Sequence, residues 1–121
     1  MGFKTQIKSI QNKNHYLCKA NSLHSRYLEE CIDVLDILNR SLKPKKMRTL
    51  LVSKLQFHME KFNEPQYIQE ACELSVSSYF AKKFPETFVY EDNVNPANNS
   101  DVDCSFKDSE FKFCIEVKCA E

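Results

Sequence analysis

The amino-acid sequence predicts an α+β protein, with helices over its first two thirds and a three-stranded meander at its end. Apolar residues recur at three- and four-residue steps between residues 22 and 84, which is the spacing of helices with one buried face. After Pro85 the pattern changes to short alternating segments separated by turn residues, which is typical of strands. At 121 residues, the chain is long enough for one small domain.

The first expected helix begins near Ser22, which we predict as its N-cap, and ends before Pro44. Residues 1 to about 20 are polar and rich in lysine without a clear period, so we expect a loose arm or a short helix there. The apolar stripe of the helix consists of Leu23, Tyr27, Leu28, Cys31, Ile32, Leu35 and Leu38.

Two further helices are expected before the strands. One runs from about Lys46 to Phe62, and His58 on its apolar face is expected to be a core or edge histidine rather than a metal ligand. The other begins with Pro65 in its first turn and ends near Phe84. Its predicted buried face consists of Tyr67, Ile68, Ala71, Cys72, Val76, Tyr79 and Phe80.

The three expected strands cover residues 87–90, 102–107 and 111–119. A loop rich in Asn and Pro separates the first two strands. Residues 108–110 form a connection of a length that suits a hairpin, so the last two strands should pair.

Composition limits where the protein acts and what it binds. No apolar run approaches the roughly 20 residues that span a bilayer, and no apolar segment follows the lysines of the N-terminus as in a secretory signal. We therefore expect a cytoplasmic protein with no membrane partner. The 17 basic and 17 acidic residues balance, whereas a dedicated sequence-independent DNA binder usually carries a basic excess.

The six cysteines include no CxxC pair, and in the cytoplasm they should be reduced and behave as small buried hydrophobes. The alternative is a zinc site, whose spacings match no standard zinc finger. Its ligands would be His15, Cys18, His24 and Cys31.

Acidic and basic residues gather at the open end of the predicted hairpin, where its first strand begins and its second strand ends. Glu116 and Lys118 alternate with apolar neighbours and therefore share one strand face, about 6 to 7 Å apart at the backbone. Asp101 and Asp103 likewise share a face at the start of the preceding strand. If the two strands pair, three carboxylates and one ammonium converge. Carboxylates of this kind bind Mg²⁺, and a lysine beside them can orient a water or stabilise charge on a phosphate.

This order of a helix with a glutamate, a strand, an acidic strand, a tight turn and Ile-Glu-Val-Lys resembles the PD-(D/E)xK nuclease superfamily. The resemblance covers about residues 64 to 121 and implies a restriction-endonuclease-like core that cleaves DNA with Mg²⁺, or with Mn²⁺ as a substitute. It assigns Glu116-Val117-Lys118 to the (D/E)xK element. It also assigns Asp101 or Asp103 to the first aspartate, and Glu73, with Glu70 as second choice, to the helix glutamate.

In the family the core continues after the ExK strand with a helix and another strand, whereas this sequence has three residues after Lys118. We therefore expect residues 63–121 to form a partial nuclease core with an open edge strand, weak or inactive by itself. Residues 1–62 would be an N-terminal helical extension. The expected partners are DNA and a second copy of the chain.

Two other functions remain open. Residues 22–84 are compatible with a helical protein-interaction module in which the hairpin is only structural. A nucleic-acid-binding protein without chemistry would use the basic cluster of Lys45, Lys46 and Arg48.

Overall fold

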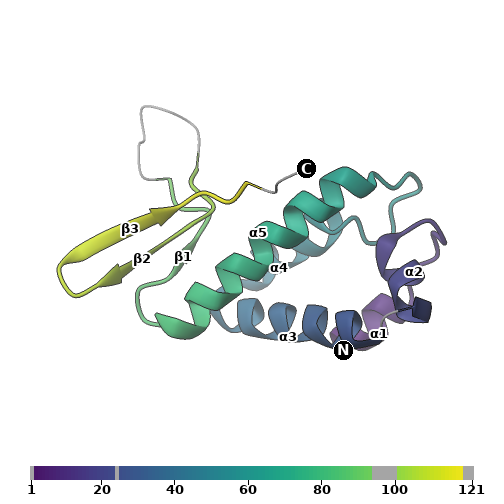
Figure 1. The fold of residues 1–121 in the computed structure, drawn as a ribbon, viewed down its shortest axis with the longest axis horizontal. Helices are drawn as coiled ribbons and strands as arrows, with labels where there is room; N and C mark the ends of the chain where they lie inside the picture. The colour runs from purple at the N-terminus through teal and green to yellow at the C-terminus, as the bar shows by residue number, and fades with distance from the viewer. Residues whose placement is uncertain (1, 24, 94–100, 119–121) are drawn as a thin grey trace.

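The computed structural model describes residues 2–23, 25–93 and 101–118, and places helices before a three-stranded antiparallel sheet (Figure 1). The predicted mixed α+β fold is thereby confirmed. The elements are α1 Phe3–Lys8, α2 Tyr16–Leu23, α3 Ser25–Ser41, α4 Pro44–Thr49, the π-helical η1 Leu50–Lys54, α5 Glu64–Lys83, β1 Val89–Tyr90, β2 Cys104–Asp108 and β3 Phe111–Ile115.

The N-terminal region is more helical than the sequence predicted. α2 begins at Tyr16, so Ser22 lies inside a helix and is not an N-cap, which corrects the predicted start. The cap is His15, whose Nδ1 accepts a 3.1 Å hydrogen bond from the backbone N–H of Leu17. A histidine is not among the residues that usually mark a helix start, so the sequence pattern gave no signal for this cap.

The second predicted helix ends early. α4 and η1 together stop at Lys54 rather than Phe62, and Gln56 and His58 then take left-handed φ angles of 59° and 64°. The side-chain amide of Gln56 donates to the backbone O of Asn63 at 3.0 Å and accepts from its N–H at 2.8 Å. These bonds close residues 56–63 into a loop, and His58 is exposed on it.

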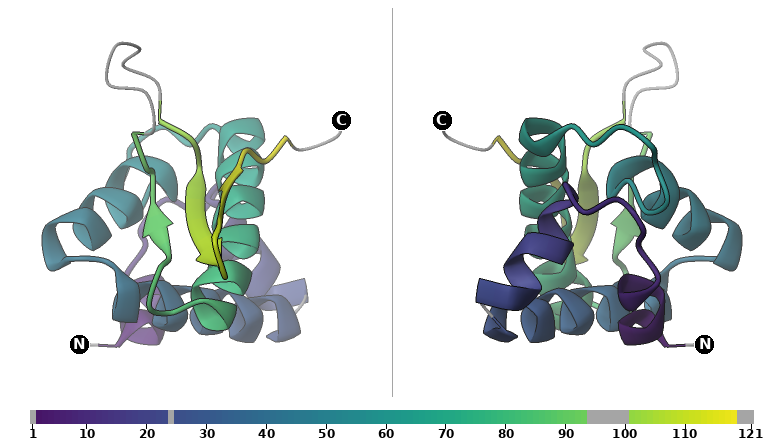
Figure 2. Two further views of the ribbon diagram at one scale, coloured as in Figure 1. Left: turned by 90° about the vertical axis from the view of Figure 1, so that its left-hand side faces the viewer. Right: turned by 90° about the vertical axis from the view of Figure 1, so that its right-hand side faces the viewer.

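α5 lies between the other helices and the sheet, and is the element on which both are assembled (Figures 1 and 2). Asn63 Oδ1 caps it by accepting a 3.1 Å hydrogen bond from the N–H of Gln66. Tyr67 and Leu74 are buried in the helical core. Ile68, which was predicted on the buried face, is 40% exposed. Because α5 is covered on two sides, its buried residues do not form the single stripe that the sequence analysis assumed.

The sheet has the order β1-β2-β3, and α5 covers one of its faces (Figure 2). Cys104 and Phe106 of β2 are buried, and the Phe106 ring stacks on Phe80 and Phe84 at centroid distances of 4.6 and 4.3 Å. Asp108 pairs with Phe111, so the hairpin loop has two residues rather than the predicted three.

β1 covers only residues 89 and 90, and β3 ends at Ile115 rather than at residue 119. β3 is the edge of the sheet, as expected, and its side chains are largely exposed.

The buried cluster draws on both predicted parts of the chain, since Phe3, Leu35 and Leu50 pack in the same core as Tyr67 and Leu74. Within the described residues, no helix combines the length and the apolar character needed to cross a membrane.

Candidate active site

Asp103, immediately before β2, is held on three sides. Its backbone N–H donates to the O of Ile115 at 3.0 Å, and its own backbone O accepts from the N–H of Glu91 at 2.9 Å. Its side-chain Oδ2 accepts from the N–H of Val117 at 2.6 Å. The pairing of β2 and β3 is thus continued past the strand ends, with a carboxylate in the place of a backbone carbonyl.

This contact fixes the Glu116-Val117-Lys118 segment beside Asp103. Val117 is half-buried, whereas Glu116 and Lys118 are exposed, so the predicted alternation is retained even though the segment lies beyond β3. Among the described residues, neither Glu116 nor Lys118 makes a hydrogen bond or an ion pair through its side chain. Asp101 is also exposed.

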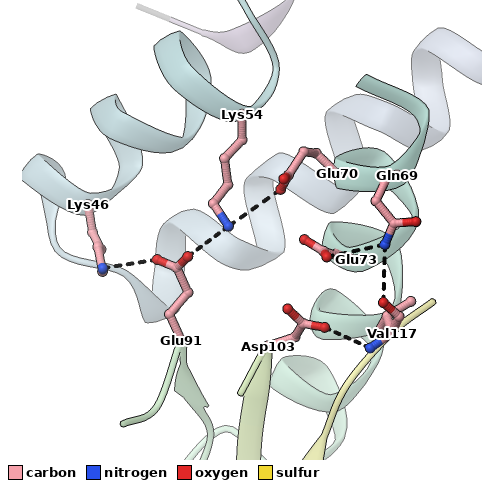
Figure 3. A network of polar contacts seen from close by, with 8 residues as sticks. All are labelled: Lys46, Lys54, Gln69, Glu70, Glu73, Glu91, Asp103 and Val117. Atoms are coloured by element: carbon pink, nitrogen blue, oxygen red, sulfur yellow. Dashed lines mark hydrogen bonds and ion pairs between the residues drawn. The ribbon is translucent and has the colours of Figure 1, made fainter. Parts of the chain in front are cut away.

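α5 brings Glu70 and Glu73 to the same end of the sheet (Figure 3). Gln69 links the helix to the segment after β3, because its side-chain Nε2 lies 3.2 Å from Oε1 of Glu73 and 3.1 Å from the backbone O of Val117. One amide therefore orients the Glu73 carboxylate and docks the ExK segment against the helix.

The neighbouring carboxylates affect the protonation of Glu73. Burial and a hydrogen bond to Glu70 raise the pKa of Glu73 to about 7, and the negative charges of Glu70 and Asp103 act in the same direction. The hydrogen bond from Gln69 opposes this shift of the pKa but does not outweigh it. At neutral pH the Glu73 carboxyl therefore holds a proton for much of the time, because burial and the neighbouring negative charges disfavour its ionised form.

Two lysines from the N-terminal helices face the carboxylates from the other side (Figure 3). Lys54 Nζ, at the end of η1, lies 2.7 Å from Oε2 of Glu91 and 3.4 Å from Oε2 of Glu70. Lys46 Nζ, on α4, lies 3.0 Å from Oε1 of Glu91. Burial is the largest single influence and disfavours the charge on Lys54, but the interactions with Glu91 and Tyr90 together outweigh burial and raise the Lys54 pKa, so this ammonium stays charged.

Glu91 contacts both lysines of this network. Burial opposes its charge, yet the hydrogen bonds from Lys54 and Lys46 lower its pKa below the ordinary value. Its φ of 51° is left-handed, a backbone conformation that costs a non-glycine residue roughly 1 kcal/mol or more and that is found at functional sites. The sequence analysis missed both Glu91 and Lys54. The one available signal was the placement of Lys54 directly before Leu55 within an apolar helical stripe.

The structure thus brings Asp103, Glu73 and Glu70 together, places Glu116 and Lys118 on the adjoining segment, and leaves Asp101 outside the contacts. The chemistry of this donor set fits a hard cation such as Mg²⁺, which prefers carboxylate oxygens. Oε2 of Glu70 is buried, and among the described residues it has the Lys54 ammonium at 3.4 Å as its ion-pair partner. Over the described ranges, however, no group of three or more His, Cys, Asp or Glu side chains already has the arrangement of a metal-ligand set. A cation would need the carboxylates to rotate toward it.

The alternative zinc site receives no support from His15. The ring is buried, its Nε2 lies 2.7 Å from the backbone O of Leu55, and its Nδ1 is occupied by the bond that caps α2. Burial lowers the pKa of His15, so the ring is neutral and structural. His24 lies outside the described residues.

The cysteines differ in their environments, although all those described are free thiols. Cys104 is buried and Cys31 is half-buried, as predicted for small hydrophobes, whereas Cys114 on β3 is exposed. The prediction was wrong for Cys114 because β3 is the edge strand and none of the described helices covers the face of the sheet on which Cys114 lies. Cys119 lies outside the described residues.

A second feature is an apolar cavity of about 310 Å³ between α3 and α5. Tyr27 and Tyr67 meet in its wall, with their hydroxyl oxygens 3.2 Å apart. Burial raises the pKa of the Cys31 thiol, which also lines the cavity, to about 11. Glu30 is the only charged residue among the described residues that line the cavity, so the cavity suits an apolar group rather than an ion.

Compared with protein-family models, curated protein sequences and solved structures, the chain gives no significant match.

Proposed function

We propose that this chain carries the metal-binding side of a restriction-endonuclease-like site, and that it acts on the phosphodiester bonds of DNA or is an inactive remnant of such an enzyme. The observation that carries the proposal is the bond from the Val117 N–H to the Asp103 carboxylate. It sets the Glu-Val-Lys segment beside an aspartate at the start of the neighbouring strand, at the end of the sheet that Glu73 of α5 faces.

In this proposal Asp103, Glu73 and Glu116 hold Mg²⁺, or Mn²⁺ in its place, and Asp101 is a substitute ligand if Asp103 keeps its bond to Val117. The chemistry that such a cation supplies when bound is polarisation of the phosphodiester and of the attacking water. Lys118 has the role of orienting that water or of stabilising charge on the phosphate. Glu73 gives up its proton when a cation is bound, because the cation replaces the proton as the neutralising charge.

The basic residues of α4 extend the proposal to the DNA. Lys45 and Arg48 are exposed, and Lys46 reaches the carboxylate network through Glu91. Phosphate contacts by such residues supply sequence-independent affinity for DNA and position the backbone. A net charge of zero over the whole chain is compatible with a local basic surface on α4 next to the acidic site.

Titration of Mg²⁺ and Mn²⁺ into the purified chain, followed by calorimetry and NMR, tests the metal site. Binding should be lost in the triple variant D101A/D103A/E116A. The matched control is D33A/D36A/E60A, which removes the same three negative charges at exposed positions away from the site and should bind as the unmodified chain does. Equal binding by both variants, or none by the folded unmodified chain, would reject the metal site.

Cleavage is tested separately. Incubation of supercoiled plasmid with the chain and Mg²⁺ should give nicked and linear DNA, and the K118M variant should lose this activity while it retains metal binding. Metal binding without cleavage would identify an inactive remnant.

The cavity between α3 and α5 favours a second candidate function, a helical interaction module that takes up an apolar side chain of a partner. Ile68 lies in its wall and is 40% exposed, so a partner that fills the cavity would also cover this apolar side chain. In that case an apolar fluorescent probe should bind the folded chain, and A71F, which fills the cavity, should abolish its binding while D101A/D103A/E116A does not. A third candidate, DNA binding without chemistry, predicts loss of binding in K45A/K46A/R48A with no dependence on metal.

A further inference from the structure

β3 is an open sheet edge with an unusual order of charges. Among the described residues, β2 is the only strand that pairs with it. Residues 110 to 118 read Glu-Phe-Lys-Phe-Cys-Ile-Glu-Val-Lys. Around Cys114, each acidic residue on one side has a basic residue at the same distance on the other side. A strand with this symmetry is complementary to an antiparallel copy of itself.

The backbone of β3 has groups available for such pairing. In a hairpin with a two-residue loop, the closing pair, here Asp108 and Phe111, directs its backbone groups toward each other. By the alternation of the ladder, Lys112, Cys114 and Glu116 then direct their N–H and C=O groups to the open edge. Val117 agrees with this alternation, since both its N–H and its O are bound on the protein side.

We infer that a second copy of this chain pairs antiparallel with β3, across a two-fold axis at Cys114. In this register Lys112 lies opposite Glu116 of the second copy, and Glu110 lies opposite Lys118 of the second copy. The two-fold axis repeats each pair, and Cys114 meets its own equivalent. Cross-strand pairs of opposite charge stabilise a sheet, and like charges directly opposite destabilise it.

Neighbouring registers are opposed by charge. An axis at Phe113 would place Glu110 opposite Glu116, and an axis at Ile115 would place Lys112 opposite Lys118. Lys112 already lies 2.9 Å from Asp92 in the monomer, but its side chain remains 45% exposed and so retains space for a second carboxylate.

The other face of the paired strands would also be covered. Phe111 and Phe113 are 68% and 44% exposed, which is high for large apolar side chains on a strand. In the same register Phe111 lies opposite Val117 of the second copy, and Phe113 lies opposite Ile115. Association therefore covers the exposed apolar residues of β3, and it removes the open edge that soluble proteins generally protect.

This inference does not depend on the proposed nuclease function. The two are nevertheless connected, because the paired register holds both Glu116 and Lys118 in ion pairs with the second copy. A cation bound by Glu116 and the dimer would therefore compete. If Mg²⁺ binds the chain, it should shift the dimer toward monomer, and if it does not bind, the dimer should be indifferent to Mg²⁺.

Sedimentation analysis of the full chain over a range of concentrations, into the millimolar range, tests the association by charge reversal. Glu110 lies in the hairpin turn and makes no side-chain contact with another described residue, so E110K should leave the fold intact, as circular dichroism can verify. E110K should weaken the dimer about tenfold, because two attractive pairs become repulsive. E110K/K118E restores opposite charges in reversed order and should recover the dimer.

The register is tested by disulfide trapping. Mild oxidation should link two chains through Cys114, since opposed residues of an antiparallel pair lie within the Cα separation that a disulfide requires. C114S should abolish the link. The matched control K112C/C114S has an equally exposed thiol two residues away, which this register places opposite Glu116, and it should not link to itself. A monomer at all concentrations, a dimer that E110K leaves unchanged, or equal trapping at positions 112 and 114 would overturn the inference.

Discussion

The backbone N–H of Val117 donates a 2.6 Å hydrogen bond to Oδ2 of Asp103, so that a side-chain carboxylate continues the β2–β3 ladder beyond the last strand residue. Together with the bond from Gln69 to the Val117 carbonyl, this contact decides where Glu116 and Lys118 lie. The contact holds the Glu-Val-Lys segment beside the aspartate of the motif. Without it, this segment would lie at an unpaired strand end.

Replacement of Asp103 should release the segment after β3. In D103A we expect the Val117 amide to exchange its hydrogen much faster and the free energy of unfolding to fall by about 1 to 3 kcal/mol, the usual cost of removing a hydrogen bond to a charged group. Hydrogen exchange by NMR and urea denaturation measure these effects. D101A is the control, since Asp101 makes no such contact. Unchanged exchange at Val117 in D103A would show that the contact does not hold the segment.

Glu73 should make stability fall as the pH rises. Its pKa is about 7 in the folded chain against an ordinary value of 4.5, so the folded state binds the proton more tightly than the unfolded state. The stabilising contribution is complete below pH 4.5 and is lost as the pH rises through 7. E73Q should remove this dependence. The free energy of unfolding of E73Q minus that of the unmodified chain should therefore be larger at pH 8 than at pH 5. Urea denaturation at the two pH values tests this, with the exposed E60Q as control. A stability difference between E73Q and the unmodified chain that is equal at both pH values would contradict it.

If the proposed metal site is correct, the affinity for Mg²⁺ should increase between about pH 6 and pH 8, because the cation must displace the proton of Glu73. Calorimetry in two buffers with different ionisation heats should detect proton release on binding. In E73Q no proton should be released. Proton release of equal size from E73Q would mean that another group titrates.

Lys54 should contribute to stability more than Lys46, although both contact Glu91. The Lys54 side chain is 21% exposed and joins Glu91 to Glu70, whereas that of Lys46 is 50% exposed. K54M leaves the half-buried Glu70 without its cation and Glu91 with Lys46 alone, and should cost about 1 to 3 kcal/mol. K46M should cost at most about 1 kcal/mol, as exposed ion pairs do. Equal losses of stability in K54M and K46M, measured by thermal or urea denaturation, would show that burial does not decide which lysine contributes more.

His15 should make the fold sensitive to acid. Burial lowers its pKa below the ordinary 6.5, and the hydrogen bond to the Leu55 carbonyl opposes this only in part. The stability contribution is therefore present above pH 6.5 and is lost as the pH falls through the pKa of the folded state. H15A should cost about 2 to 4 kcal/mol near neutral pH, since it removes a buried ring and two hydrogen bonds. The cost should be smaller at pH 5. The control is H58A, because His58 is exposed. A loss of stability in H15A that increases toward low pH would contradict a lowered pKa of His15.

The helices and the hairpin could be predicted because they depend on local periodicity. Leu28, Leu35 and Leu38 are buried on α3 as their spacing indicated, and Pro65 lies in the first turn of α5. The alternation of Glu116 and Lys118 with half-buried neighbours was also visible in the sequence, because side chains of an extended segment alternate faces wherever it packs.

Other features depended on contacts between distant residues. The cap of α2 is a histidine that is also held by Leu55, and the loop after Lys54 is closed by Gln56 and Asn63. Neither leaves a periodic pattern. Cys114 differs from Cys104 in exposure because one strand is at the sheet edge and the other is central, which strand order decides.

The sequence by itself determined the α+β order of the elements, the α3 stripe and the charge symmetry around Cys114, because each follows from residue type and spacing along the chain. Only the tertiary structure decided that Asp103 contacts the motif segment while Asp101 stays exposed, and that Lys54 and Glu91 join the carboxylates. The strength of an interaction between charges is set by their separation in space and by burial, and neither is encoded at any single position.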